Sequence, residues 1–327
     1  MKSWKAEAFG NIDDVLKLVD VPELAAPPPG CLTLRVLATG VGLPDVLMTL
    51  GKYPLVAKPP VSPGQEVVGI VTAVADGAAF EVGDRVLATS LFRENCGGFS
   101  EQCYVSTEFA CKVPEGMPDE QAAGFIIPFQ TAYAALVQRC QLLAGETLLV
   151  LGASGSSGSA AIVLGKALGA TVIAVAGGED KCTFCRSVGA DYVVDYRQGP
   201  IAEQVREHVA AVDVIFDPVG GASYDDAVKA IGLHGRVALI GFGSGTWAQL
   251  DPKDMVMRSY SALGVFLARC SREDIAAAYV DLLAMYAQGK IRVPVDKVYS
   301  FSEVPLALNE VASSRLLGKH IVRVSDE

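Results

Sequence analysis

Short apolar runs alternate with helix-like stretches through the middle of the chain. The runs predicted as strands are residues 147–152, 171–176, 192–195, 213–216 and 236–241, with a sixth at 260–267. The stretches between them that predict helices are residues 158–168, 180–187, 201–209 and 222–231. Strands that are apolar on both faces and separated by helices indicate a parallel sheet covered on both sides. We therefore expect an α/β fold with a six-stranded parallel sheet.

The first 120 residues have a different pattern. Apolar runs at 31–39, 66–74 and 85–88 are separated by clusters of glycine and proline, which is typical of short antiparallel strands in a barrel-like unit. Residues 121–135 favour a helix that Pro128 would kink or divide. After the parallel sheet, the pattern predicts helices at 273–288 and 304–313 and strands near 297–301 and 320–324.

Composition and charge narrow the class of protein. Of the 327 residues 51% are hydrophobic and 20% are charged, which is a globular composition. The net charge of −10 disfavours nucleic acid or an anionic membrane as the main partner. No apolar run approaches the roughly 20 residues that span a bilayer. Because the N-terminus also lacks the apolar segment of a signal peptide, we expect a cytoplasmic protein.

Cysteine and histidine give little support for a metal or disulfide site. Eight cysteines in 327 residues are too sparse for a disulfide scaffold. Cys182 and Cys185 form a CxxC spacing on a predicted helix, where packing is favoured over redox or metal chemistry. The three histidines lie far from other plausible ligands in the sequence. No metal is therefore expected.

A glycine-rich turn follows the first strand of the predicted parallel sheet. Gly152, Gly155 and Gly158 enclose Ser154, Ser156 and Ser157 and lead into a helix. Glycines let backbone N–H groups approach a diphosphate, and the helix N-terminus adds partial positive charge. The motif stands in the strand-turn-helix context that a dinucleotide site requires.

The end of the second strand bears on which dinucleotide binds. The chain has Gly177 and Gly178 where an NAD-preferring site usually has an acidic side chain. The glycines leave room for a 2′-phosphate, which Lys181 could neutralise. Tyr196-Arg197, after the third strand, could flank the adenine and add positive charge. Glu179 and Asp180 oppose this interpretation, and Lys181 in a surface salt bridge is the alternative. We favour NADPH.

Several segments carry a resemblance to a known family: residues 40–45, 51–54, 63–66, 82–86, 130–133, 166–170 and 188–191. With the order of elements, they make the chain similar to the medium-chain dehydrogenase/reductase superfamily. The closer likeness is to its zinc-free, zeta-crystallin-like quinone oxidoreductase branch. The resemblance implies a GroES-like catalytic and substrate domain at 1–122 and 268–327. It implies a Rossmann dinucleotide-binding domain at 123–267.

The resemblance also bears on zinc. Zinc-dependent relatives place a ligand cysteine at the position of Gly42 and a ligand histidine at the position of Gln65. Glycine offers no ligand atom and an amide is a poor zinc ligand, so alcohol dehydrogenation is disfavoured. Quinones and α,β-unsaturated carbonyls are already activated by conjugation. For such an acceptor the protein mainly has to hold the nicotinamide C4 against the reacting carbon.

The resemblance assigns the acceptor pocket to Gly42, Leu43 and Tyr53. Tyr53 would donate a hydrogen bond to the acceptor's oxygen, and the alternatives are a packed loop aromatic or a proton from solvent. The branch often has asparagine at the position of Gly42 and glycine at that of Ser156. The loss of asparagine at Gly42, with Leu43 and Pro44 after it, suggests an enlarged apolar cleft. The Ser156 hydroxyl could serve the diphosphate or narrow the turn.

The resemblance places further residues around the cofactor. Thr131 would lie near the nicotinamide ring, Gly241-Phe242-Gly243 would close over the cofactor, and the backbone around Phe266 would meet the carboxamide. Arg315 would approach the phosphates.

Two other functions remain open from the sequence. An enoyl-thioester reductase has the same fold, and Lys52 and Lys58 could meet a thioester's phosphates, although solvated lysines are the simpler interpretation. An NADPH-binding redox sensor or structural protein is the other. The apolar strand near 260–266 would lie at the sheet edge, and it predicts a homodimer.

Overall fold

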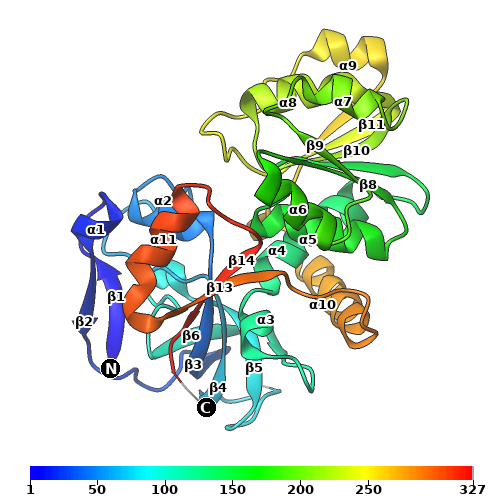
Figure 1. Ribbon diagram of the computed structural model, residues 1–327. Coiled ribbons are helices and arrows are strands. Elements are labelled where there is room, and N and C mark those ends of the chain that lie inside the picture. The colour runs from blue at the N-terminus through cyan, green and yellow to red at the C-terminus, as the bar shows by residue number, and fades with distance from the viewer. Residues whose placement is uncertain (78, 326–327) are drawn as a thin grey trace. The chain divides into compact units, whose positions relative to one another are not determined.

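The computed structural model describes residues 1–77 and 79–325, which form two compact units (Figure 1). The first unit contains Met1–Ile126 and Val295–Glu327, and the second contains Ile127–Pro294. The second unit therefore extends beyond the expected domain boundary at residue 267. The helix after that boundary belongs with it, because Gln138 donates to the carbonyl of Asp274 at 2.8 Å and Tyr133 donates to the Asp281 carboxylate.

The second unit is built on a six-stranded sheet in the order β12-β11-β10-β7-β8-β9, in which every pairing is parallel. This is the doubly wound order: the chain adds β8 and β9 on one side of β7 and then β10, β11 and β12 on the other side. It confirms the predicted α/β fold. The strands are β7 (Thr147–Val150), β8 (Thr171–Ala176), β9 (Tyr192–Asp195), β10 (Val212–Asp217), β11 (Ile231–Leu239) and β12 (Ser261–Gly264).

Helices cover both faces of this sheet, with α5 and α6 on one face and α7 and α8 on the other (Figure 1). The helices of the unit are α4 (Ile126–Tyr133), a π-helix (Ala134–Arg139), α5 (Ser156–Ala167), α6 (Glu179–Ser187), α7 (Ile201–Arg206), α8 (Gly221–Ala227), α9 (Pro252–Arg258) and α10 (Arg272–Ala287), with 3-10 turns Val228–Ala230 and Leu267–Arg269. Burial on both faces explains why the strands read as continuous apolar runs.

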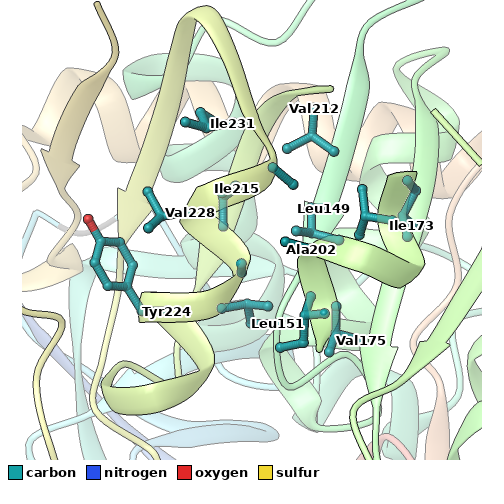
Figure 2. Packing of buried hydrophobic residues seen from close by; sticks show 14 of the residues in the cluster. Leu149, Leu151, Ile173, Val175, Ala202, Val212, Ile215, Tyr224, Val228 and Ile231 are labelled. Carbon is teal, nitrogen blue, oxygen red and sulfur yellow. The ribbon is translucent and has the colours of Figure 1, made fainter. Parts of the chain in front are cut away.

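Alternate strand residues fill the core on the side of α7 and α8. In Figure 2, Leu149 and Ile173 of neighbouring strands lie beside Ala202 of α7, whereas Tyr224 of α8 lies beside Val228. All of them belong to one apolar cluster with Ile215. The intervening strand residues are equally buried and face α5 and α6. On that side a Cβ on Gly165 of α5 would lie 2.7 Å from Leu148, so the glycine lets the helix lie close to the sheet.

The expected helix at 121–135 is divided, but not at its proline. It consists of α3 (Asp119–Ala123) and α4, and the break lies at Gly124 and Phe125. Pro128 falls in the first turn of α4, where the amide hydrogen that it lacks has no intrahelical acceptor. The proline therefore begins a helix instead of kinking one.

The first unit contains a mostly antiparallel sheet in the order β13-β14-β3-β4-β5-β6, and an additional β3–β6 pairing closes four strands into a barrel. Only β13–β14 is parallel. The strands are β3 (Cys31–Val41), β4 (Glu66–Val74), β5 (Arg85–Ser90), β6 (Gln102–Lys112), β13 (Val295–Ser300) and β14 (Lys319–Arg323), beside a hairpin of β1 (Lys2–Ala6) and β2 (Leu16–Asp20). The barrel-like prediction is confirmed.

Short helices complete the first unit: α1 (Ile12–Val15), α2 (Leu43–Thr49), α3, α11 (Val304–Ala312), and the 3-10 turns Phe92–Glu94 and Phe301–Glu303. Helix α11 packs with α2 and with the β1–β2 hairpin in one apolar cluster that includes Trp4, Val46 and Leu308. Among residues 1–77 and 79–325, no helix has both the length and the apolar character needed to cross a bilayer.

Candidate functional site

The glycine-rich turn joins β7 to α5 in the second unit. Gly152 has φ +56°, and a Cβ there would lie 2.9 Å from Val219. A Cβ on Gly158 would lie 2.3 Å from the Gly152 carbonyl oxygen. A Cβ on Gly155 would lie 3.5 Å from the same oxygen, an ordinary contact. Two of the three glycines are therefore required by the backbone itself, which brings the start of the helix against the end of the strand.

The helix begins earlier than the sequence predicted, at Ser156, with Gly155 as its extended N-cap. No side chain caps this end, so N–H groups of the first turn point outward without an intrahelical acceptor. Ser154 is buried and Ser156 and Ser157 are half-buried around them. The turn and the helix N-terminus fit a diphosphate, which satisfies such N–H groups and gains from the helix dipole.

A second cluster surrounds the end of β8. The Tyr196 ring packs onto Gly177, where a Cβ would lie 2.5 Å from the ring and leave no space for it. Lys181 is half-buried on α6. Burial, with the neighbouring Arg197 guanidinium, lowers the pKa of the Lys181 ammonium. Two cationic groups therefore lie close together where the sequence places the adenosine ribose.

Two of the acidic residues nearby, Glu179 and Asp195, are held in other contacts. Glu179 accepts from Thr183 at 3.0 Å and from Arg186 at 3.1 Å, so its carboxylate lies along the outside of α6. Asp195 accepts from the Gly178 N–H at 3.1 Å and from the Arg197 N–H at 3.0 Å. Burial opposes the ionisation of Asp195, but these N–H groups hold its pKa below the usual range. Asp195 thus shapes the loop at the end of β8.

The loop after β11 packs on the loop after β10. The Gly243 N–H donates to the Pro218 carbonyl at 2.9 Å, and a Cβ on Gly241 would lie 3.2 Å from the same oxygen. The Phe242 and Trp247 rings lie 4.6 Å apart. Trp247 was not singled out from the sequence, although it is 53% exposed at the carboxyl edge of the sheet.

Three more predicted cofactor residues lie on different parts of the chain. Thr131 is buried on α4 of the second unit, and Phe266 lies just after β12 with 43% of its surface exposed. Arg315 belongs to the first unit, where it is exposed after α11. Sequence reasoning also missed Asp217 at the end of β10. Its buried carboxylate accepts from the N–H groups of Val219 and Gly220, both at 2.8 Å.

The residues predicted for the acceptor all lie in the first unit. Gly42 is the extended N-cap of α2, with φ −137°, so its backbone does not require glycine. Leu43 follows it and is 39% exposed. Tyr53 is half-buried, with its ring 6.3 Å from that of Phe92. The ring contact with Phe92 fits the alternative of a packed loop aromatic, and donation by the Tyr53 hydroxyl to the acceptor stays a prediction.

A polar cluster that sequence reasoning did not identify lies behind these residues. Both oxygens of the buried Asp45 accept backbone hydrogen bonds, from Gly42 at 2.9 Å and from Gly64 at 2.8 Å. Glu66 and Lys319 form a buried ion pair. Burial raises the pKa of Asp45 to about 6, against the lowering effect of the Gly64 N–H and of Lys319. The sequence signal that could have identified this cluster is the position of Asp45, Glu66 and Lys319 close to apolar residues.

The two positions at which zinc-dependent relatives hold ligands carry Gly42 and Gln65. Within the described residues, no three histidine, cysteine, aspartate or glutamate side chains gather in a way that could hold a metal ion. Both observations argue against a zinc site built from these residues, because zinc prefers thiolate, imidazole and carboxylate ligands. The eight cysteines are all free thiols, five of them buried.

Comparison with known proteins identifies the family. The model described as alcohol dehydrogenase GroES-like domain matches residues 28–118, and the model described as zinc-binding dehydrogenase matches residues 158–285. The chain is 30% identical over 308 residues to the quinone oxidoreductase-like protein 2 of Rattus norvegicus, covering 91% of this chain and 87% of that protein. The chain belongs to the quinone oxidoreductase branch of the medium-chain dehydrogenase/reductase superfamily.

Two further relatives match over nearly their whole length. The human quinone oxidoreductase is 28% identical over 326 residues, covering 98% of this chain and 97% of that protein. The solved quinone oxidoreductase of Thermus thermophilus, also determined in complex with NADPH, is 30% identical with a TM-score of 0.84, covering 99% and 100% of the two chains. The predicted resemblance and fold are confirmed, and the chain is an NAD(P)H-dependent oxidoreductase of this branch.

Proposed function

We propose that this oxidoreductase uses NADPH to reduce a quinone or an α,β-unsaturated carbonyl without zinc. The observation that carries the acceptor class is the pair of residues at the zinc-ligand positions, Gly42 and Gln65, neither of which suits the metal. Polarisation of an unactivated alcohol or ketone would then lack its usual Lewis acid. A conjugated acceptor needs less polarisation by the protein, because its reacting carbon is already electrophilic.

The two units would divide the work. In the second unit, the turn at Gly152–Gly158 and the start of α5 would hold the diphosphate, and the bound nicotinamide would supply the hydride. In the first unit, Gly42 and Leu43 would line the acceptor's pocket and leave it wide. Tyr53 would donate a hydrogen bond to the acceptor's oxygen as negative charge develops there.

The cofactor preference rests on Lys181 and Arg197 beside Gly177. Two neighbouring cations favour the 2′-phosphate of NADPH. Burial, and after it the Arg197 guanidinium, lowers the pKa of Lys181, and that dianion would offset the repulsion between the two cations. Because Glu179 is held by Thr183 and Arg186, its carboxylate does not need to meet the phosphate.

The test is oxidation of NADPH and NADH by purified protein with 1,4-benzoquinone and with a simple enone. We expect NADPH to be preferred, and Lys181→Ala to weaken NADPH binding about 10-fold with little change for NADH. Lys290→Ala, at an exposed lysine of the same unit, is the matched control and should leave both cofactors unaffected. Equal use of the two cofactors by the wild type would reject the NADPH preference.

Two other functions follow from specific features. An enoyl-thioester reductase is supported by Lys52 and Lys58, both exposed on the loop that carries Tyr53. Turnover of crotonyl-CoA well above that of benzoquinone would favour it. A non-catalytic NADPH-binding protein would bind the cofactor without turnover of any of these acceptors, and Tyr53→Phe would then change nothing.

The predicted homodimer is supported by the position of β12 at the end of the sheet order. The strand is largely exposed, and the preceding helix α9 exposes Val256 and Met257. An unprotected edge strand flanked by apolar side chains favours pairing with a second copy. Sedimentation would test this, and the cytoplasmic location stays a prediction.

A further inference from the structure

Gln65 carries a buried hydrogen-bond donor that has no partner of good geometry among the described residues. Its side chain is only 5% exposed, and its Nε2 makes no hydrogen bond within the described part of the chain. Buried amide nitrogens are almost always paired, so an unpaired one in a native protein needs an explanation. A ligand that accepts the hydrogen bond is one such explanation.

The backbone on either side of Gln65 is firmly held. The Gln65 carbonyl accepts from the Ser90 N–H at 2.8 Å, and the Gly64 carbonyl accepts from the Ser90 hydroxyl at 2.6 Å. Gly64 has φ +104°, and a Cβ there would lie 2.5 Å from the backbone nitrogen of Phe99. The amide is thus presented from a fixed point and not from a mobile loop, as preorganised catalytic groups are.

The acceptors that surround this amide are committed elsewhere. Asp45 uses one oxygen for Gly42 and the other for Gly64, and the Glu66 carboxylate is paired with Lys319. The amide lies near the Tyr53 hydroxyl. It opposes the rise that burial causes in the pKa of Tyr53, yet no hydrogen bond of good geometry joins the two. Two groups that can donate, an amide and a phenol, therefore lie together in the first unit.

We propose that the Gln65 amide is a catalytic residue that donates a hydrogen bond, beside Tyr53, to the carbonyl oxygen of the acceptor. The inference rests on the proposed function. The hydride brings two electrons to the conjugated carbon, the π electrons move to the carbonyl oxygen, and the nicotinamide is oxidised. Gln65 keeps its proton and stabilises the oxyanion, which is then protonated by Tyr53 or by water. The amide thus performs at this position the polarisation that zinc performs in zinc-dependent relatives.

The first test replaces Gln65 by methionine, which has similar volume and no N–H. We expect kcat/KM for benzoquinone and for an enone to fall about 100-fold, the effect of removing one oxyanion donor. NADPH binding, followed by fluorescence, should not change. The melting temperature should stay the same or rise, because an unpaired buried donor is removed.

Thr33→Val is the matched control. Thr33 lies on β3 of the same unit, is also buried, and its Oγ1 also lacks a partner in the described residues. Its replacement should have the same mild effect on stability as Gln65→Met and no effect on turnover. A purely structural role for Gln65 predicts instead that Gln65→Met lowers the melting temperature.

A second variant, Gln65→Glu, tests whether the side chain at position 65 acts by donating a hydrogen bond or only by filling space. A protonated carboxyl can donate to the acceptor's oxygen, whereas a carboxylate among Asp45, Glu66 and Lys319 would repel the developing charge. Its activity relative to the wild type should therefore rise as pH falls, while the deficit of Gln65→Met stays constant. Equal deficits of the two variants at every pH would overturn the donor role.

The outcomes also separate this inference from the function on which it rests. A wild-type enzyme that turns over neither acceptor rejects the proposed function, and this inference with it. Wild-type turnover that Gln65→Met leaves within threefold rejects the role of Gln65 alone.

Discussion

In the proposed function, the glycine-rich turn of the second unit and the polar cluster of the first, Tyr53, Gln65, Asp45, Glu66 and Lys319, would serve the same reaction. The two are specified in different ways. The turn is set by backbone geometry within seven residues, since Gly158 has no room for a Cβ. The cluster is set by side chains from α2, β4, β14 and the segment between α2 and β4, which meet only when the sheet forms. The first is a local constraint and the second is a consequence of burial.

The largest effect should come from breaking the buried ion pair of the cluster. Lys319→Met leaves the Glu66 carboxylate buried without its cation, which should lower the free energy of unfolding by about 4 kcal/mol. Urea denaturation measures it. The double variant Glu66→Leu with Lys319→Met removes both charges and should recover most of that loss, because an apolar pair of similar volume is often as stable as a buried ion pair.

A cluster held by side chains can thus be repaired by a second substitution. A Lys319→Met cost below about 1 kcal/mol, or a double variant no more stable than the single one, would show that burial of this pair does not govern the cluster.

The turn should behave in the opposite way. In Gly158→Ala the Cβ meets the Gly152 carbonyl oxygen, a backbone atom that cannot move aside without distorting β7. We expect a loss of about 3 kcal/mol in stability and more than about 10-fold weaker NADPH binding. Thermal unfolding and cofactor fluorescence measure the two.

Gly155→Ala is the matched control for stability. Its φ is −81°, a value that any residue adopts, and its Cβ would make only an ordinary contact. Equal melting temperatures for the two variants would contradict the view that backbone contact, and not glycine content, defines the turn.

This difference explains what the sequence could predict. The parallel sheet and the glycine-rich turn follow from patterns within a few tens of residues, and the structure has both. The residues predicted beside Gly177 also lie together, and their role toward the cofactor stays a prediction. The helix starts were less accurate, because Gly155 caps α5 without a side-chain signal. Gln65 was noted only as a poor zinc ligand, since nothing in the sequence shows that its amide is buried and unpaired. Asp45, Glu66 and Lys319 were missed for the same reason.

The C-terminal boundary of the second unit could not be predicted from local sequence patterns either. Helix α10 follows the last strand and was assigned to the catalytic domain by resemblance. Its contacts with Tyr133 and Gln138 join residues more than a hundred positions apart, and such contacts depend on the folded chain.

The smallest of the three expected effects concerns Asp45 and pH. Burial raises its pKa from an ordinary 3.8 to about 6, so the folded chain holds this proton more tightly than the unfolded chain. The contribution is fully present below about pH 4 and is lost as pH rises through about 6. About two pKa units correspond to about 3 kcal/mol.

Asp45→Asn cannot ionise, and it isolates this contribution from all other titrating groups. The variant loses one backbone hydrogen bond at every pH, because its NH₂ cannot accept from both Gly42 and Gly64. The loss of this hydrogen bond lowers the free energy of unfolding by the same amount at each pH. The informative quantity is therefore how the difference in unfolding free energy between variant and wild type changes with pH. Relative to the wild type, the variant should gain up to about 3 kcal/mol between about pH 4 and pH 7 in urea titrations. A difference that stays flat over this range would mean that the Asp45 carboxylate is solvated in the folded protein. Burial of charged side chains would then not be what defines the polar cluster.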